Sequence, residues 1–171
     1  MKRPIFWYAV YTKSRQEKAL EQRLTETGIE AYVPIQKVVR QWSDRKKLVE
    51  VPLIRSYCFV KIHMTRYYDV LNTPGAVRYI WFSGKPAAIP DRQIDILKVI
   101  TGANIPVDVI PSGFKPGARV RITAGPMTGI EGELIRLAGK NKVVIRIEHL
   151  NQAIALTISP MILELGTNNE E

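Results

Sequence analysis

Residues 114–146 read FKPGARVRITAGPMTGIEGELIRLAGKNKVVIR, and they decide the fold of the C-terminal part of the chain. Val120 and Ile122 alternate with polar residues, which predicts a half-buried strand. A second strand contains Gly132, and a glycine inside a strand often marks a bulge or a sharp bend. The turn signal at Gly139 precedes a third strand that begins near Val143. This spacing predicts a very small, strongly bent barrel.

Turn residues join these strands. Pro116 presets φ for a turn, and we expect Gly117 to take the positive φ that a type II turn requires. Gly125-Pro126 turns the chain again, followed by Gly129 and Gly132. This proline-glycine and glycine-proline pattern resembles the KOW motif, which occurs in NusG-type transcription elongation factors and in several ribosomal proteins. The resemblance implies a small, all-β, SH3-like domain, and we place it at residues 114–165.

Charge is distributed unevenly along the 171 residues. Residues 1–108 contain 18 lysines and arginines against 10 aspartates and glutamates, whereas residues 109–171 contain 7 against 6. Almost all of the net charge of +9 therefore lies in the first part. Such basicity indicates nucleic acid or another polyanion as a neighbour, although a generally basic, soluble surface has the same composition.

The pattern before residue 104 predicts an α+β domain with a mostly antiparallel sheet and flanking helices. Ile5–Thr12 is apolar on both faces, which predicts a central strand. Ser14 and Glu17 form a capping-box pattern that predicts a helix start at Ser14. Further elements are expected at 29–34, 57–63 and 77–82 as strands and at 65–72 and 90–101 as helices. We therefore divide the chain into a first domain at 1–103, a linker at 104–113, the barrel, and a polar tail at 166–171.

A basic hairpin interrupts this domain. Residues 37–42 and 48–53 are predicted strands, joined by a turn at Ser43-Asp44-Arg45-Lys46. The hairpin carries Arg40 and Lys46 among other cations, with Trp42 near its tip. It fits either a contact with a nucleic-acid backbone or a solvated, mobile hairpin.

Several segments of the first domain resemble the N-terminal domain of NusG. They are Trp7–Thr12 with the basic helix after it, Pro52–Val60, and Pro74-Gly75-Ala76-Val77 followed by a strand and Ile89-Pro90. Together with the KOW segment, the resemblance covers nearly the whole chain in the family's order. The long hairpin and the Pro-Leu-x-x-x-Tyr-x-Phe-Val segment are closer to the specialised RfaH and UpxY-type antiterminators, and UpxY-type factors act on capsule-polysaccharide operons.

The resemblance implies a factor that binds the clamp helices of the largest RNA polymerase subunit and suppresses pausing. Tyr11, Tyr57 and Phe59 match family positions that line the apolar contact surface, and aromatic side chains are effective anchors. Trp7 and Tyr8 lie beside them and fit either the core or the interface. We include Tyr8 among the candidate polymerase-binding residues.

Specialised family members also contact the non-template DNA strand. Lys13, Arg15 and Gln16 occupy matching positions, where the cations would bind phosphates and Gln16 would read a base edge. Solvent-exposed charges at a helix start are the alternative. Arg40 and Lys46 of the hairpin complete the candidate nucleic-acid-binding set. RfaH has a short His/Thr run for a second polymerase contact, but this chain has Arg66-Tyr67-Tyr68-Asp69 there, which leaves that contact in doubt.

The KOW domain of the family recruits a partner, such as a ribosomal protein or the termination factor Rho. Phe114, Met127 and Ile130 are the candidate residues for such a surface. RfaH-type factors can refold this domain into a helical hairpin. Here the valines and isoleucines at 143–158, together with the glycines, favour strand over helix, so we expect the barrel.

Other chemistry has little support in the sequence. One cysteine and two scattered histidines make a poor metal site, and no nucleophile or acid–base pair indicates an enzyme. No cofactor is expected. The apolar start of the chain is too short for a signal peptide, and no apolar run reaches the length of a membrane helix, so a cytoplasmic monomer is expected. Two alternatives stay open, a ribosomal or RNA-binding KOW protein and a general NusG.

Overall fold

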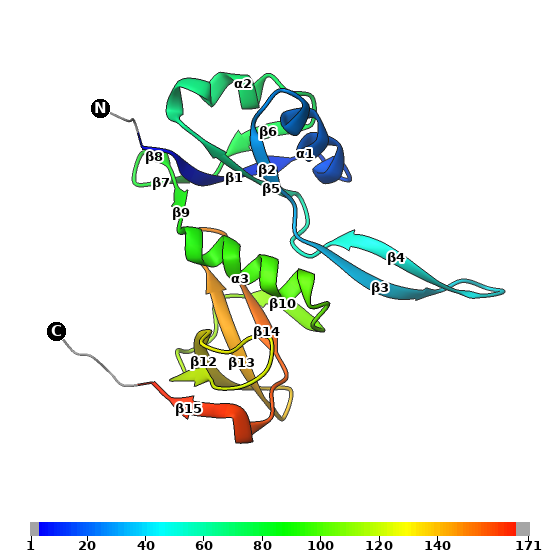
Figure 1. Cartoon of the computed structure of the whole chain (residues 1–171), viewed down its shortest axis with the longest axis vertical. Coiled ribbons are helices and arrows are strands. Elements are labelled where there is room, and N and C mark those ends of the chain that lie inside the picture. The colour runs from blue at the N-terminus through cyan, green and yellow to red at the C-terminus, as the bar shows by residue number, and fades with distance from the viewer. Residues whose placement is uncertain (1–3, 167–171) are drawn as a thin grey trace. The chain divides into compact units, whose positions relative to one another are not determined.

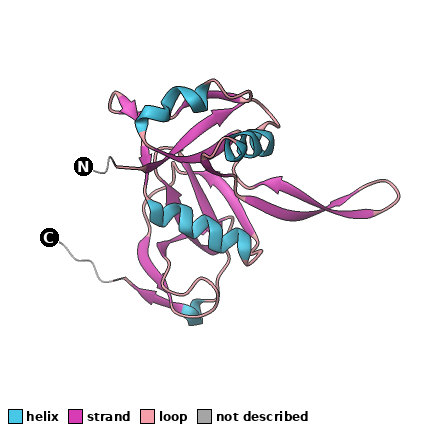
Figure 2. Ribbon diagram, turned by 45° about the horizontal axis from the view of Figure 1, so that its top comes forward, coloured by secondary structure: helices cyan, strands magenta, loops and turns pink. Residues whose placement is uncertain are grey.

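The computed structural model describes residues 4–166, which separate into two compact units at Leu97/Lys98 (Figure 1). Each unit is described by itself. The first unit is α+β and the second is all-β, as the sequence predicts (Figure 2). Of the residues predicted as a polar tail, 167–171 lie outside the described part of the chain.

The first unit is built on an antiparallel sheet in the order β2-β5-β1-β6, with β9 also paired to β1. β1 and β5 form six in-register pairs, from Phe6↔Ile62 to Tyr11↔Tyr57. The elements are β1 (Phe6–Thr12), α1 (Glu17–Glu26), β2 (Glu30–Tyr32), β3 (Ile35–Gln41), β4 (Lys46–Pro52), β5 (Tyr57–Ile62), a 3-10 turn at Met64–Arg66, α2 (Tyr67–Leu71), β6 (Ala76–Tyr79), β7 (Trp81–Phe82), β8 (Lys85–Pro86), β9 (Ala88–Ile89) and the first part of α3 (Asp91–Gly102), a helix that continues past the boundary at Leu97/Lys98.

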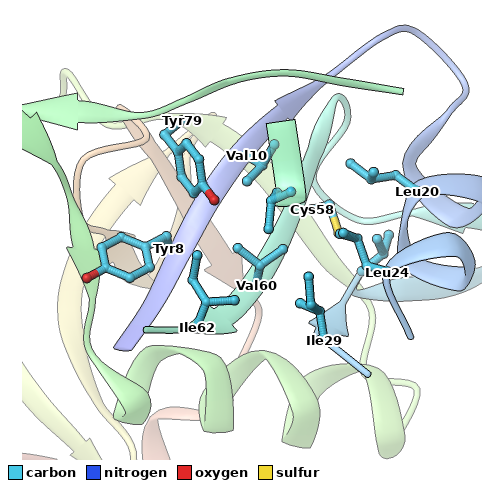
Figure 3. Close-up of a cluster of buried hydrophobic side chains, with 11 residues drawn as sticks. Tyr8, Val10, Leu20, Leu24, Ile29, Cys58, Val60, Ile62 and Tyr79 are labelled. Atoms are coloured by element: carbon cyan, nitrogen blue, oxygen red, sulfur yellow. The ribbon is translucent and has the colours of Figure 1, made fainter. Parts of the chain in front are cut away.

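One core cluster of this unit lies on the face of the sheet where α1 and α2 pack, and Trp7, Ala9 and Phe59 are buried on the opposite face. Since side chains alternate along a strand, every second residue of β1 and β5 points to the face with α1. Leu20 and Leu24 of α1 meet these side chains in one buried cluster (Figure 3). Val70 of α2 belongs to the same cluster. Cys58 belongs to the cluster, and burial raises the pKa of its thiol, so the thiol stays protonated and unreactive.

The start of α1 differs from the prediction. The helix begins at Glu17, and no side chain caps it at Gln16. Arg15 takes a φ of 62°, which a right-handed helix cannot contain, so the capping box at Ser14 does not form. Glu17 is buried instead, and its carboxylate accepts the backbone N–H of Ser56 at 2.8 Å.

The predicted hairpin is present as β3 and β4, which form a two-stranded sheet with seven in-register pairs. It projects from the sheet as a long ribbon (Figures 1 and 2). Its tip is exposed, and Trp42 retains 54% of its surface. Leu53 is buried and donates its backbone N–H to the carbonyl of Pro34, which closes the base of the ribbon.

The second unit is a six-stranded antiparallel sheet in the order β10-β14-β13-β12-β11-β15. The strands are β10 (Val107–Pro111), β11 (Ala118–Ile122), β12 (Glu131–Leu137), β13 (Lys140–Ile147), β14 (Gln152–Leu156) and β15 (Leu163–Leu165), with a 3-10 turn at Pro160–Ile162. After α3, the described part of this unit therefore consists of strands and turns. This confirms the predicted all-β state, and the alternative helical hairpin is not the state observed.

The predicted linker at 104–113 contains a strand. β10 lies within it and forms five register pairs with β14. An ion pair between Asp108 Oδ2 of β10 and Lys142 Nζ of β13, 3.1 Å apart, also links β10 to the sheet. The prolines of this segment stand outside the strand interior, at Pro106 and at the final residue Pro111, so they do not prevent it from pairing.

Two glycines allow the close packing of this unit. A Cβ at Gly117 would collide with the carbonyl oxygen of Leu134, and a Cβ at Gly132 would lie 2.7 Å from Val143 Cγ1. Gly117 is not among the residues with positive φ, so the reason predicted for this glycine is wrong. It is needed because two backbones approach closely there.

The burial of Phe59 gives a stability prediction. Phe59→Ala removes a side chain with no exposed surface, and we expect a loss of about 3–5 kcal/mol in the free energy of unfolding. All three tryptophans lie in the first unit, at 7, 42 and 81, so urea unfolding followed by tryptophan fluorescence reports on that unit. Phe82→Ala, which removes a side chain that is 58% exposed, is the matched control. Equal losses for both variants would contradict the assignment of Phe59 to the core.

Candidate functional site

A row of three side chains crosses the sheet of the first unit, on the face opposite α1. Tyr11 pairs with Tyr57 on one side and with Arg78 on the other, so all three point to this face. The Tyr11 and Tyr57 rings meet edge to face with centroids 5.7 Å apart, and the Arg78 guanidinium lies 5.5 Å from the Tyr11 centroid. We call these three residues the tyrosine row.

The tyrosine row is accessible to a partner. Tyr11 retains 36% of its surface, Tyr57 is half-buried and Arg78 is exposed. Burial raises the pKa of the Tyr57 hydroxyl, Tyr11 adds to the rise, and Arg78 opposes it. The hydroxyl is therefore neutral at physiological pH and available as a hydrogen-bond donor.

The other two predicted polymerase-binding residues are not on this surface. Phe59 lies on the same face as the tyrosine row but has no exposed surface. Tyr8 points to the α1 face, is 6% exposed, and packs edge to face on Tyr79 at 6.2 Å (Figure 3). In this conformation a partner cannot reach either ring. Arg78 was not predicted, since only the β1–β6 register brings it beside Tyr11.

The predicted nucleic-acid-binding residues fall into three places. Arg15 and Arg40 line one groove with Lys18 and Arg55. Lys13 and Gln16 lie toward Gly75: the Lys13 backbone N–H donates to the Gly75 carbonyl, and the Gln16 side-chain oxygen accepts from Arg23 at 3.3 Å. Lys46 is exposed next to the hairpin turn, opposite Gln41. Sequence reasoning missed Arg55 as a groove residue because it occupies an unspecified position of the Pro-Leu-x-x-x-Tyr-x-Phe-Val segment.

The predicted partner surface of the second unit is also divided. Met127 is only 4% exposed and belongs to the core, so in this conformation a partner cannot reach its side chain. Ile130 is half-buried. Phe114 is half-buried beneath Arg146, whose guanidinium lies 4.1 Å from the ring centroid. Met161 and Leu165, which were not predicted, are the exposed large apolar side chains here, at 92% and 73%.

Arg146 fixes the segment that leads into β11. Its guanidinium forms two hydrogen bonds with Glu133, Nε to Oε1 at 2.8 Å and Nη2 to Oε2 at 3.1 Å, and donates to the carbonyls of Ser112 and Phe114. Glu133 also accepts the Gly117 backbone N–H at 3.2 Å. The hydrogen bonds from Arg146 hold the pKa of Glu133 below its usual value.

Two kinds of feature are absent from residues 4–166. Among these residues, no three His, Cys, Asp or Glu side chains are grouped as metal ligands would be. None of the helices between Pro4 and Gly166 has the length and apolar character that a membrane span requires.

Comparison with known proteins places the chain in a family. The family model described as "Transcription termination factor nusG" matches residues 6–98. The protein named transcription termination/antitermination protein NusG from Pseudomonas aeruginosa is 29% identical over 140 residues, covering 74% of this chain and 78% of the relative. The protein of the same name from Borreliella burgdorferi is 25% identical over 146 residues, covering 74% and 79%.

A solved structure supports the fold. The structure described as "Domain interaction in Thermotoga maritima NusG" aligns with a TM-score of 0.56 and 22% identity, covering 95% of this chain and 97% of that one. It agrees with the α+β unit followed by an all-β unit.

The Glu133–Arg146 pair gives a pH prediction. Because the folded-state pKa of Glu133 is lowered, the pair stabilises the second unit above the unfolded pKa of about 4.3, and this contribution is lost as pH falls through the lower folded value. Glu133→Gln should cost about 1 kcal/mol at pH 7, with the difference from the parent shrinking in acid. The measurement is urea unfolding followed by the amide NMR signals of 143–147. A difference in the free energy of unfolding between Glu133→Gln and the parent that persists unchanged at pH 3 would contradict the ionic origin of the stabilisation. Glu148→Gln is the control variant.

Proposed function

The chain belongs to the NusG family of transcription termination/antitermination factors, and on that premise we propose that it binds RNA polymerase through the tyrosine row. Factors of this family act with RNA polymerase and are not enzymes. The single observation that carries the proposal is that the Tyr11–Tyr57 pair keeps accessible surface on the sheet face opposite α1. Two adjacent tyrosines bury large area at small entropic cost, which is typical of interface anchors.

We propose the clamp helices of the largest polymerase subunit as the surface bound. Arg78 beside the ring of Tyr11 supplies a positive edge to the apolar contact. A helix that packs its apolar residues on the tyrosine rings and places a carboxylate near Arg78 would match both features. Holding the clamp closed would suppress pausing.

A specialised role on selected operons, such as those for polysaccharide biosynthesis, is part of the proposal. It is supported by the basic hairpin and by the cations in and near the groove, which would contact the non-template DNA strand. General NusG activity is the second candidate, because the relatives reported above are named NusG and not after a specialised paralogue. Deletion of the gene separates the two, since a specialised factor changes RNA levels on a few operons and a general factor changes them genome-wide.

A ribosomal or RNA-binding KOW protein is less well supported. The family match covers residues 6–98, which lie outside the KOW segment. We propose instead that the second unit recruits a ribosomal protein or Rho. Ile130 and Phe114 stay in the proposed surface, and the exposed Met161 and Leu165 are added to it.

Replacing both tyrosines tests the polymerase contact. Tyr11→Ala/Tyr57→Ala should weaken binding to core RNA polymerase by about 30-fold, equivalent to roughly 2 kcal/mol at an interface anchor. The measurement is a titration of labelled protein with purified core enzyme, with circular dichroism to verify folding.

The control for that titration is Tyr68→Ala. Tyr68 is the most exposed large aromatic residue of the first unit, at 69%, and lies on α2, which packs on the opposite face of the sheet. Its removal should leave polymerase affinity unchanged. Equal affinities for the double variant and the parent would show that the tyrosine row is not the contact.

A further inference from the structure

The ribbon of β3 and β4 is accessible along its whole length. Its two strands pair only with each other, and no residue of either strand is buried. The ribbon projects as an arm beyond the sheet and helices of the first unit (Figure 2). Both of its faces are therefore available to a partner.

Two large aliphatic side chains lie next to each other on one face of this ribbon. Val39 is the register partner of Leu48, so the two side chains point to the same face. They keep 65% and 60% of their surface exposed. Strand propensity does not explain the pair, because leucine is not β-branched and threonine supports a strand without adding apolar surface. Covering the pair with a protein partner would remove this apolar surface from water, which is favourable.

The ribbon is also strongly basic. Residues 37–50 contain five lysines and arginines against two acidic residues, Asp44 and Glu50. Of these two, Glu50 is already paired with Lys18, whose Nζ lies 3.3 Å from Glu50 Oε2. Two copies of this ribbon would repel each other, so a second copy of the chain does not fit the surface. An acidic partner is complementary to it.

Strand alternation divides the cations of the ribbon between its two faces. Lys37 and Lys46 lie on the same face as Val39, one toward the base of the ribbon and one toward its turn. Arg40 and Lys47 are register partners on the opposite face. We call the first of these the Val39 face. It has an aliphatic centre with an exposed lysine on either side along the ribbon.

We propose that the Val39 face docks on an acidic surface of RNA polymerase. Apolar side chains of the polymerase would cover Val39 and Leu48, and carboxylates around them would pair with Lys37 and Lys46. The inference rests on the proposed function, because the arm extends from the unit that carries the tyrosine row. It adds a second polymerase contact to that row, and it reassigns Lys46 from nucleic acid to protein.

The mixture of side chains on the ribbon favours a protein over the two other kinds of anionic surface. A nucleic-acid backbone offers phosphates to the lysines but no apolar group to an aliphatic pair. A segment that lies on anionic lipid keeps its apolar and cationic residues on opposite faces. Here the second face also carries both kinds, since Val38 and Val49 are register partners beside Arg40 and Lys47.

Replacing the aliphatic pair tests the contact. Val39→Thr/Leu48→Thr keeps β-branched residues in both strands and should weaken binding to core RNA polymerase about 10-fold, as expected for two side chains at an interface. Val38→Thr/Val49→Thr makes a similar change on the opposite face and should leave the affinity unchanged. The measurement is a titration of labelled full-length protein with purified core enzyme, with circular dichroism to verify folding.

Replacing the two lysines tests the acidic character of the partner surface. Lys37→Gln/Lys46→Gln should weaken binding to core enzyme at low ionic strength. The difference from the parent should disappear at high ionic strength, because salt screens exposed charge pairs. Parental affinity of this variant at low ionic strength would contradict an acidic partner surface.

A photo-crosslink identifies what the Val39 face touches. The experiment places p-benzoylphenylalanine at position 39 and adds core enzyme assembled on a labelled DNA–RNA scaffold. We expect an adduct to a polymerase subunit that nuclease treatment does not remove. The same amino acid at position 57 reports separately on the tyrosine row.

Several results would overturn the assignment of the ribbon. They are parental affinity of Val39→Thr/Leu48→Thr, an equal loss in its control Val38→Thr/Val49→Thr, an adduct from position 39 to nucleic acid, or no adduct from position 39. If position 57 still crosslinks, the ribbon contact alone fails. Loss of the crosslink at both positions would remove the proposed function as well.

Discussion

The pairing of β1 with β5 is the constraint on which the first unit depends. Six in-register pairs fix which side chain of each strand points to which face. On one face Val10, Cys58 and Val60 join the core with α1. On the other, the same register places Tyr57 beside Tyr11, and the β1–β6 register adds Arg78. A shift of one residue would bury the tyrosines and expose the core, so folding and partner binding share one requirement.

The sequence predicts the order and type of most elements, because alternation along strands and turn residues are local signals. It predicts both units, the basic hairpin and the β state of the second unit. It does not predict β10, since the prolines around Val107–Pro111 argue for a linker and only β14 supplies the strand's partner. The start of α1 was missed for a similar reason: tertiary contacts of Glu17 and the conformation of Arg15 replace the local cap.

The candidate sites could be predicted only in part. Strand parity places Phe59 and Tyr57 on one face, but it does not reveal that the first is covered and the second is not. The burial of Tyr8 and Met127 depends on how the elements pack in three dimensions, which strand parity does not predict. The groove shows the opposite case, because Arg15 was selected for its position in the family resemblance and Arg40 as a cation of the hairpin, and the fold brings them together with Arg55.

The central claim is that the accessible pair of Tyr11 and Tyr57, on the sheet face opposite α1, contacts RNA polymerase. The most direct measurement is photo-crosslinking with p-benzoylphenylalanine placed at position 57 or, separately, at position 68, in the presence of core enzyme. The account predicts a crosslink to the largest polymerase subunit from position 57 and none from position 68. No crosslink from position 57 in a folded protein, or an equally strong one from position 68, would contradict it.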